Sequence, residues 1–85
     1  MKVIRVNIPH IREIYHNGEF VANLYRIGEG FGHGMIKEGE WVINRGTAAI
    51  HRGTFFPPVS YPTIKEAIKA IRSVVREWGT PTSEN

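Results

Sequence analysis

Residues 63–78 have the sequence TIKEAIKAIRSVVREW, which has the pattern of a helix with one apolar side. The rest of the chain must therefore provide a surface against which this side can pack. Thr63 and Glu66 have the spacing of a capping box, in which each side chain bonds a backbone N–H of the other residue. Gly79 and Pro81 favour an end to the helix just beyond. The large apolar residues recur at helical spacing in one stripe: Ile64, Ile68, Ile71, Val75 and Trp78. We therefore predict one amphipathic helix that packs on a sheet formed by the preceding residues.

The clearest sheet signal is a β-hairpin over residues 11–27, IREIYH-NG-EFVANLYRI. Its two strand-like runs flank Asn17-Gly18, the dipeptide best suited to positive φ in a two-residue type I′ turn. A loop of this length fixes the register, so we expect Ile14 to face Val21. Both faces of the hairpin then carry apolar residues. One face has Ile11, Tyr15, Phe20, Ala22 and Leu24, and the other has Ile14, Val21, Tyr25 and Ile27.

Further short strands are predicted on either side of this hairpin. Residues 1–8 alternate until Pro9, and the segments 35–37, 40–44 and 47–52 have strand-like patterns. Glu38-Gly39 and Arg45-Gly46 mark turns between them, with glycine in the left-handed region. In the last hairpin we expect a common side for Trp41, Ile43, Ala48 and Ile50.

The predicted fold class is α+β, an antiparallel sheet of four to five short strands (a β-hairpin meander) packed against one C-terminal α-helix. Residues 54–62 are expected to form an extended connection, because each proline disfavours helix at the residue before it. We predict a single domain over residues 1–79 and a disordered tail over residues 80–85.

The composition is that of one small folded domain. The chain has 85 residues, of which 41% are hydrophobic. It has no cysteine, which is compatible with the cytoplasm, the expected location. No run approaches the ~20 apolar residues that cross a bilayer, so we expect no membrane partner. The net charge of +3 favours an acidic partner such as nucleic acid, although it also serves solubility.

A glycine-rich segment, GEGFGHG, occupies residues 28–34. The stretch IGEGFGHGMI over residues 27–36 resembles the glycine-rich loop of protein kinases, which also lies between two strands. The resemblance implies no catalytic role here, because no HRD-type or DFG-type segment follows and the chain is too short for a kinase. We interpret the segment as a mobile hairpin loop that presents Phe31 to a partner.

No set of residues indicates catalysis, a metal site or a cofactor. The histidines lack the spacing of a zinc-binding helix, and no serine lies in a GxSxG motif. Glu13 alternates with Ile11 and Tyr15, where burial would raise its pKa. We favour instead a position near the sheet edge, where its carboxylate reaches water or an arginine. We expect a non-enzymatic binding protein.

The predicted helix carries a second stripe, formed by Lys65, Lys69, Arg72 and Arg76. It is rotated about 100° from the apolar line and has no interleaved carboxylate. Such a row can follow the phosphates of DNA or RNA, or it can be an ordinary solvated face. Together with Phe31 it is our candidate nucleic-acid-binding site. The sequence does not show which side Arg12, Arg26, Arg45 and Arg52 occupy.

The alternative is a protein-binding module. If the helix covers one face of the first hairpin, the residues exposed on the other are Ile14, Val21, Tyr25 and Ile27, unless residues 1–8 or 55–59 cover them. Such a surface would suit a homodimer, or a small phage or mobile-element inhibitor of a host protein. The sequence leaves both alternatives open.

Overall fold

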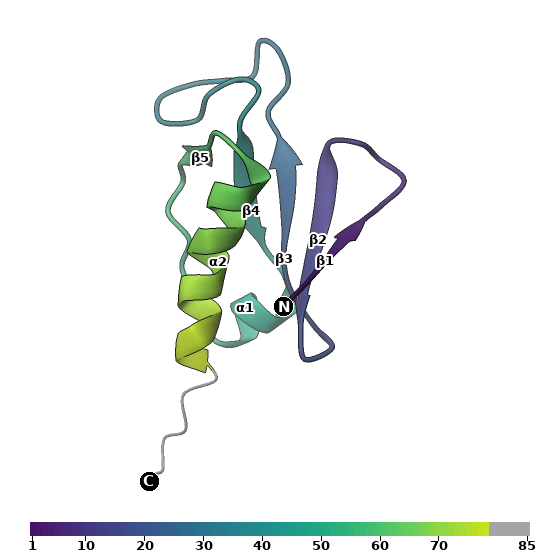
Figure 1. The fold of residues 1–85 in the computed structure, drawn as a ribbon. Coiled ribbons are helices and arrows are strands. Elements are labelled where there is room, and N and C mark those ends of the chain that lie inside the picture. Colours follow the sequence, from purple (N-terminus) through teal and green to yellow (C-terminus); the bar gives the residue numbers. More distant parts are fainter. Residues whose placement is uncertain (79–85) are drawn as a thin grey trace, which may run out of the picture.

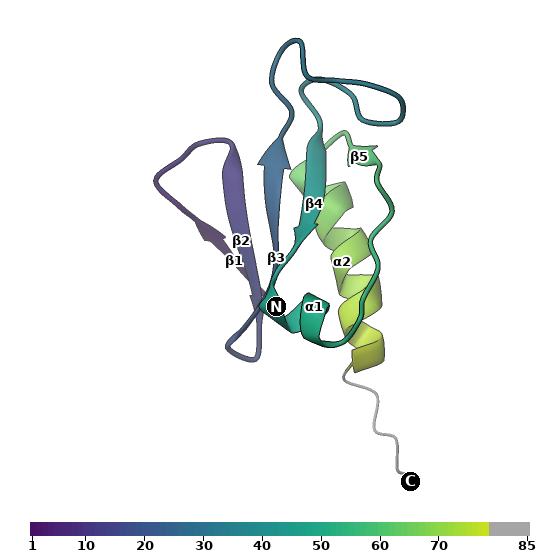
Figure 2. The same cartoon turned by 180° about the vertical axis from the view of Figure 1, so that it is seen from behind.

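A computed structural model describes residues 1–78. Five antiparallel strands form one sheet in chain order, and a long helix lies against one face (Figure 1 and Figure 2). The strands are β1 (Lys2–Arg5), β2 (Ile11–His16), β3 (Glu19–Arg26), β4 (Trp41–Arg45) and β5 (Ser60–Tyr61), and the helices are α1 (Thr47–His51) and α2 (Ile64–Trp78). The predicted α+β meander with a C-terminal helix is confirmed. The predicted helix end at Gly79 and Pro81 and the predicted tail lie outside the described residues.

The β2–β3 hairpin turns at Asn17-Gly18 as predicted, but its register shifts at Val21. Asn17 and Gly18 have φ values of 52° and 79°, and two regular pairs follow the turn. Beyond them Ile14 pairs with Ala22, which leaves Val21 as an extra residue in a β-bulge. The predicted pairing of Ile14 with Val21 is therefore wrong.

The bulge gives the hairpin one main apolar face instead of two. Ile14, Val21 and Ala22 are all 0% exposed and belong to a single core cluster beneath α2. Ile27 is also buried, and only Tyr25 is exposed, at 39%. The expected exposed surface of Ile14, Val21, Tyr25 and Ile27 is therefore wrong for three of its four residues. Without the bulge, Ile14 and Ala22 would lie on opposite faces of the sheet.

A short helix, α1, replaces the strand predicted over residues 47–52. Gly46 donates its N–H to the Val21 carbonyl at 2.8 Å, and a Cβ on Gly46 would lie 2.6 Å from the Phe20 carbonyl oxygen. Only glycine fits this close approach, and its φ of −87° is not the left-handed value predicted. Ala48 and Ala49 favour helix and are buried where α1 packs against β3. The common side predicted for Trp41, Ile43, Ala48 and Ile50 is therefore absent.

The glycine-rich segment belongs to the loop between β3 and β4. The strand predicted over residues 35–37 is reduced to one bridge, in which His33 and Ile36 exchange N–H···O bonds of 2.8 and 2.9 Å. The Ser60 hydroxyl accepts the Lys37 N–H at 2.9 Å, which ties the loop to β5. Gly39 has a φ of 78°, as predicted.

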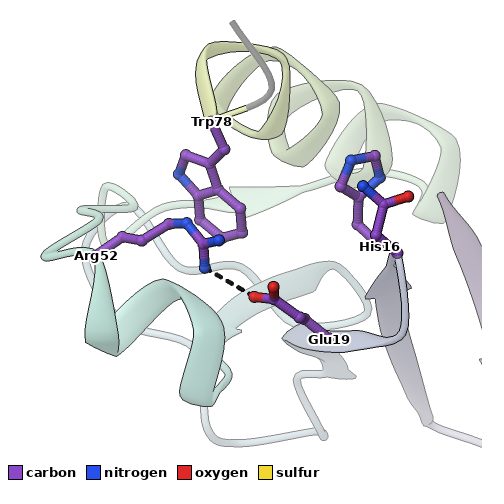
Figure 3. Close-up of a pocket in the computed structure, with 5 residues that line it drawn as sticks. His16, Glu19, Arg52 and Trp78 are labelled. Carbon is purple, nitrogen blue, oxygen red and sulfur yellow. Dashed lines mark hydrogen bonds and ion pairs between the residues drawn. The ribbon is translucent and has the colours of Figure 1, made fainter. Parts of the chain in front are cut away.

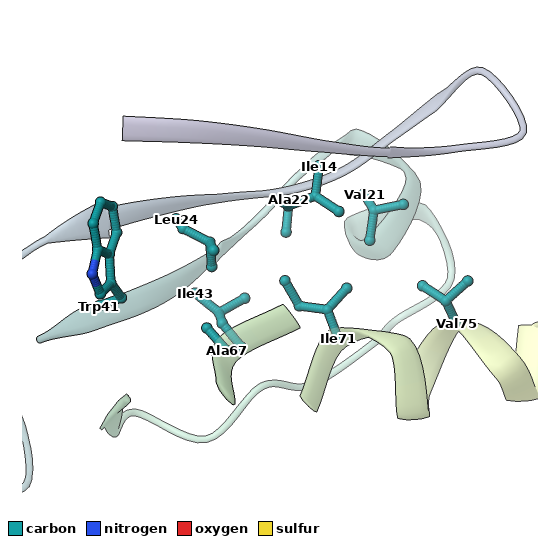
Figure 4. Close-up of a cluster of buried hydrophobic side chains, with 9 residues drawn as sticks. All are labelled: Ile14, Val21, Ala22, Leu24, Trp41, Ile43, Ala67, Ile71 and Val75. Atoms are coloured by element: carbon teal, nitrogen blue, oxygen red, sulfur yellow. The ribbon is translucent and has the colours of Figure 1, made fainter. Parts of the chain in front are cut away.

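α2 buries the predicted stripe with Ile71 at its centre. The Glu66 N–H donates to the Thr63 hydroxyl at 3.1 Å, which confirms the Thr63 side of the predicted capping box. Ala67, Ile71 and Val75 are buried, and residues packed partly buried around them include Ile64, Ile68 and Trp78. The sheet contributes Ile14, Val21, Ala22, Leu24, Trp41 and Ile43 to the same core (Figure 4).

Candidate functional site

α2 presents its four cations in one exposed row, which we call the basic row: Lys65, Lys69, Arg72 and Arg76. At ~100° per residue the row lies roughly 100–160° around the helix from Ile71, and it extends about 16 Å along the axis. Glu66 and Glu77 lie further around the helix, at roughly 220° and 240° from Ile71. Within residues 1–78, its first three members form no ion pair with a carboxylate.

The basic row borders a part of the sheet that α2 does not cover. α2 packs mainly on β4 and β5, and Figure 1 shows β1 and β2 diverging from it. The register places Val3 opposite Ile14, so both point to the α2 side. Yet Val3 is 41% exposed and Ile14 is fully buried. We call this uncovered region the open half of the sheet, formed by Val3, Arg5, Arg12 and His16.

Two arginines lie side by side in the open half. Arg5 is directly opposite Arg12, and both line a cavity of about 250 Å³. Arg12 Nη1 donates to the carbonyls of Pro9 at 2.7 Å and Ile11 at 2.9 Å, and its guanidinium carbon lies 5.5 Å from the Trp41 ring centroid. Like charges on opposed strand residues repel each other, so this pair favours an anion nearby.

A second cavity joins the open half to α2. It has a volume of about 380 Å³ and is lined by Met1, His16, Arg72, Val75 and Arg76. None of these residues is acidic, and two belong to the basic row. The Nδ1 atom of His16 is buried without a hydrogen-bond partner among residues 1–78. Guanidinium and imidazole groups together offer N–H donors to an anionic oxygen.

A smaller pocket at the β2–β3 turn is built around an ion pair (Figure 3). Arg52 Nη1 donates to Glu19 Oε1 at 2.8 Å, and the Arg52 guanidinium carbon lies 4.5 Å from the Trp78 ring centroid. This hydrogen bond and the charge of Arg52 lower the pKa of Glu19. The Trp78 indole N–H donates to the Thr54 hydroxyl at 3.1 Å. The pocket, which His16 also lines, encloses only about 60 Å³, so its contacts mainly join α1, α2 and the hairpin.

The opposite face of the sheet has a different chemistry. The register aligns Glu13, Asn23 and Asn44 across β2, β3 and β4. The Tyr15 hydroxyl donates to Glu13 Oε1 at 3.1 Å, and this bond raises the pKa of Tyr15. Glu13 is thus half-buried and bound by Tyr15, whereas water or an arginine was expected. The exposed Tyr25 also lies on this face, away from the basic row.

Phe31 is not part of the open half. It is 75% exposed in the β3–β4 loop, where its N–H donates to the Gly28 carbonyl at 3.2 Å. Figure 1 shows this loop near β5, at the end of the molecule where α2 begins. The predicted row of four cations is therefore brought together, and the loop that carries Phe31 lies at the end of the molecule where α2 begins.

Sequence reasoning missed His16 as a neighbour of Arg72 and Arg76 and Arg5 as a partner of Arg12, and it left the side of Arg12 open. Alternation along residues 1–8 and 11–16 was the available signal, but it does not say which strands a helix covers. The register places Arg26 and Arg45 on the α2 side, opposite Trp41 and Ala22.

Within the part of the chain that the structure describes, no three His, Asp or Glu side chains are placed to hold a metal ion. No helix among residues 1–78 is long and apolar enough to cross a membrane. Comparison with protein-family models, curated proteins and solved structures found no match for this chain. The functional conclusion therefore rests on the geometry and charge of the surface.

Proposed function

We propose that this protein is a non-enzymatic binding domain for nucleic acid, which it contacts through the basic row and the open half of the sheet. One observation carries the proposal. Four cations lie exposed along α2, beside a sheet region whose charged side chains are arginines and include no carboxylate. A surface that only needed solvation would not require charges of one sign.

The dimensions of the basic row suit a polyanion. Its length of about 16 Å corresponds to roughly five nucleotide steps of 3.4 Å along one strand. Contacts of this kind bind phosphates and carry little sequence information. We therefore propose affinity with weak sequence preference for DNA or RNA, and Phe31 offers a ring on which a base can stack beyond the end of the row. We place this activity in the cytoplasm, in keeping with a chain that has no cysteine.

The second candidate is a protein-binding module, as a homodimer or as a phage or mobile-element inhibitor of a host protein. The exposed apolar residues that mainly support it are those of the β3–β4 loop, in place of the first hairpin. Phe31 and Met35 in this loop are 75% and 69% exposed. Pairing of two β1 edges is disfavoured, because Lys2 and Arg5 would meet like charges on an antiparallel copy.

A salt titration of binding to labelled random-sequence DNA and RNA tests the proposal. We expect log K to fall linearly with log salt, and the double charge reversal Lys69→Glu/Arg72→Glu to reduce the slope by about 0.7–0.9 for each phosphate that is no longer neutralised. The control Lys2→Glu/Lys37→Glu changes the net charge equally but lies outside the basic row and the open half, so it should alter the slope less.

Failure to bind any nucleic acid at low salt would overturn the proposal, as would equal effects of the two double variants. A dimer seen by light scattering, and dissociated by Phe31→Ser/Met35→Ser, would favour the second candidate.

A further inference from the structure

The cavity of about 380 Å³ beside the last turns of α2 has features that a phosphate-following row does not require. Its volume lies within the roughly 300–1,000 Å³ of small-ligand sites. Val75, which is 4% exposed, provides an apolar wall, while Arg72 and Arg76 bring two positive charges to the same space. Among residues 1–78, no carboxylate lines the cavity.

His16 occupies a fixed place at this cavity. It directly precedes the two-residue turn at Asn17-Gly18, so the tight loop determines its position on β2. Its Nδ1 atom is buried without a partner among residues 1–78. Leaving a buried polar atom unpaired costs free energy, and such atoms often mark a site completed by water or a ligand.

A carboxylate beside His16 is engaged in the smaller pocket. Glu19 pairs with His16 across the turn, and its Oε1 accepts the 2.8 Å bond from Arg52 in the smaller pocket (Figure 3). Arg52 thus balances the charge of Glu19. Glu19 therefore does not neutralise Arg72, whose charge can act on a ligand in the larger cavity.

We propose that His16 and Arg72 bind one phosphate group in this cavity, with Arg76 adding positive charge to its wall. A guanidinium can donate two parallel N–H bonds to phosphate oxygens, and the imidazole can donate a third. The inference extends the proposed function, because it assigns a defined phosphate position to the C-terminal end of the basic row. Free phosphate, a terminal phosphate and a backbone phosphodiester share this chemistry.

Nuclear magnetic resonance of the full chain tests this site directly. The probe is inorganic phosphate added at constant ionic strength, with chloride as the control anion. We expect saturable shifts of the His16 ring and Arg72 guanidinium signals with phosphate and none with chloride. Arg72→Gln and His16→Gln should each weaken phosphate binding about tenfold, the effect of losing one charge-assisted bond. Lys69→Gln, which removes a neighbouring charge outside the cavity, should change it far less.

Two short oligonucleotides, with and without a terminal phosphate, separate the sources of the group. Tighter binding of the phosphorylated one, lost in Arg72→Gln, would assign the cavity to chain ends. Equal binding with the same His16 shifts would assign it to the backbone, and both results support the site. The Arg72 side chain is exposed, so Arg72→Gln remains informative even if His16→Gln does not fold.

The site and the proposed function can fail separately. Saturable phosphate binding without any binding of polynucleotide would uphold the site and overturn the proposed function. Polynucleotide binding that Lys69→Gln and Arg72→Gln weaken equally, with no shift of His16, would uphold the function and overturn the site.

Discussion

The sheet presents two unlike halves to the side on which α2 lies. Toward β4 the strand residues that face the middle of the helix are apolar and buried, as with Leu24 and Ile43, whereas the arginines on this side, Arg26 and Arg45, lie at the strand ends. Toward β1, on the same side, Val3 is 41% exposed and Arg5 lies opposite Arg12. The strands pair in the same antiparallel way throughout, so the difference arises from where the helix lies.

Simple dimensions explain why one half stays uncovered. A helix with its side chains is about 10–12 Å wide, whereas five strands spaced ~4.8 Å apart extend over about 19 Å. One helix therefore covers roughly half of this sheet. Solvation explains why the other half is polar, but it does not explain why its charged residues are all cationic. The covered half holds the fold together, and the open half is where we place binding.

The largest expected effect separates the two halves by their contribution to stability. Ile71→Ala removes a side chain that is 0% exposed and should lower the free energy of unfolding by about 2–5 kcal/mol. Val3→Ala, in the open half, should cost at most about 1 kcal/mol, because Val3 is already 41% exposed. Urea unfolding measures both. Equal costs would mean that the β1 side is covered in solution.

The next effect concerns the close approach of Gly46, the residue before α1, to β3 in the covered half. Gly46→Ala places a Cβ 2.6 Å from the Phe20 carbonyl oxygen and should destabilise the fold by about 1–3 kcal/mol. Gly28→Ala is the matched control, because its Cβ would make an ordinary 3.6 Å contact with Phe31. If thermal unfolding shows the two variants to be equally stable, the close approach of Gly46 to β3 is wrong.

A smaller effect tests how α2 is held at its start, at the edge of the covered half. Thr63→Ala removes the hydroxyl that accepts the Glu66 N–H and should cost about 1 kcal/mol. Thr63→Ser keeps an oxygen at this position and should retain most of the stability. Chemical denaturation of the three proteins gives the comparison, and a Ser variant as weak as the Ala variant would argue against the cap.

The smallest effect lies in the ion pair that joins α1 to the hairpin. Arg52 lowers the pKa of Glu19 in the folded chain below its ordinary value of 4.5. Ionised Glu19 therefore stabilises the fold at neutral pH, and this contribution is lost as the pH falls below 4.5 through the folded pKa. Glu19→Gln should make the urea midpoint less sensitive to acid. Both partners are exposed, so the change should be small, and unaltered acid sensitivity would contradict the pairing.

The elements that determine their own geometry could be predicted from the sequence. Asn17-Gly18 carries its turn conformation within two residues, and Thr63 caps α2 through a contact three residues away. The bulge at Val21 and the helix α1 depend instead on Gly46 meeting β3, a contact between segments far apart in the chain. Local patterns therefore predicted a strand where packing favours a helix.

The candidate site likewise has parts that could be predicted from the sequence and parts that could not. Helical periodicity alone placed Lys65, Lys69, Arg72 and Arg76 in one row, and the structure keeps them together. The open half could not be predicted, because no local signal in the sequence says which strands α2 covers. The cavity beside His16 needs the end of β2 and the last turns of α2 to meet, which only the tertiary fold provides.

The most direct test of the open half is a map of backbone amide shifts on adding a short oligonucleotide to the ¹⁵N-labelled chain. We predict shifts at Arg5, His16 and Arg72, and none at Asn23 or Asn44 on the opposite face. Shifts confined to that opposite face, or to residues 28–40, would contradict the account.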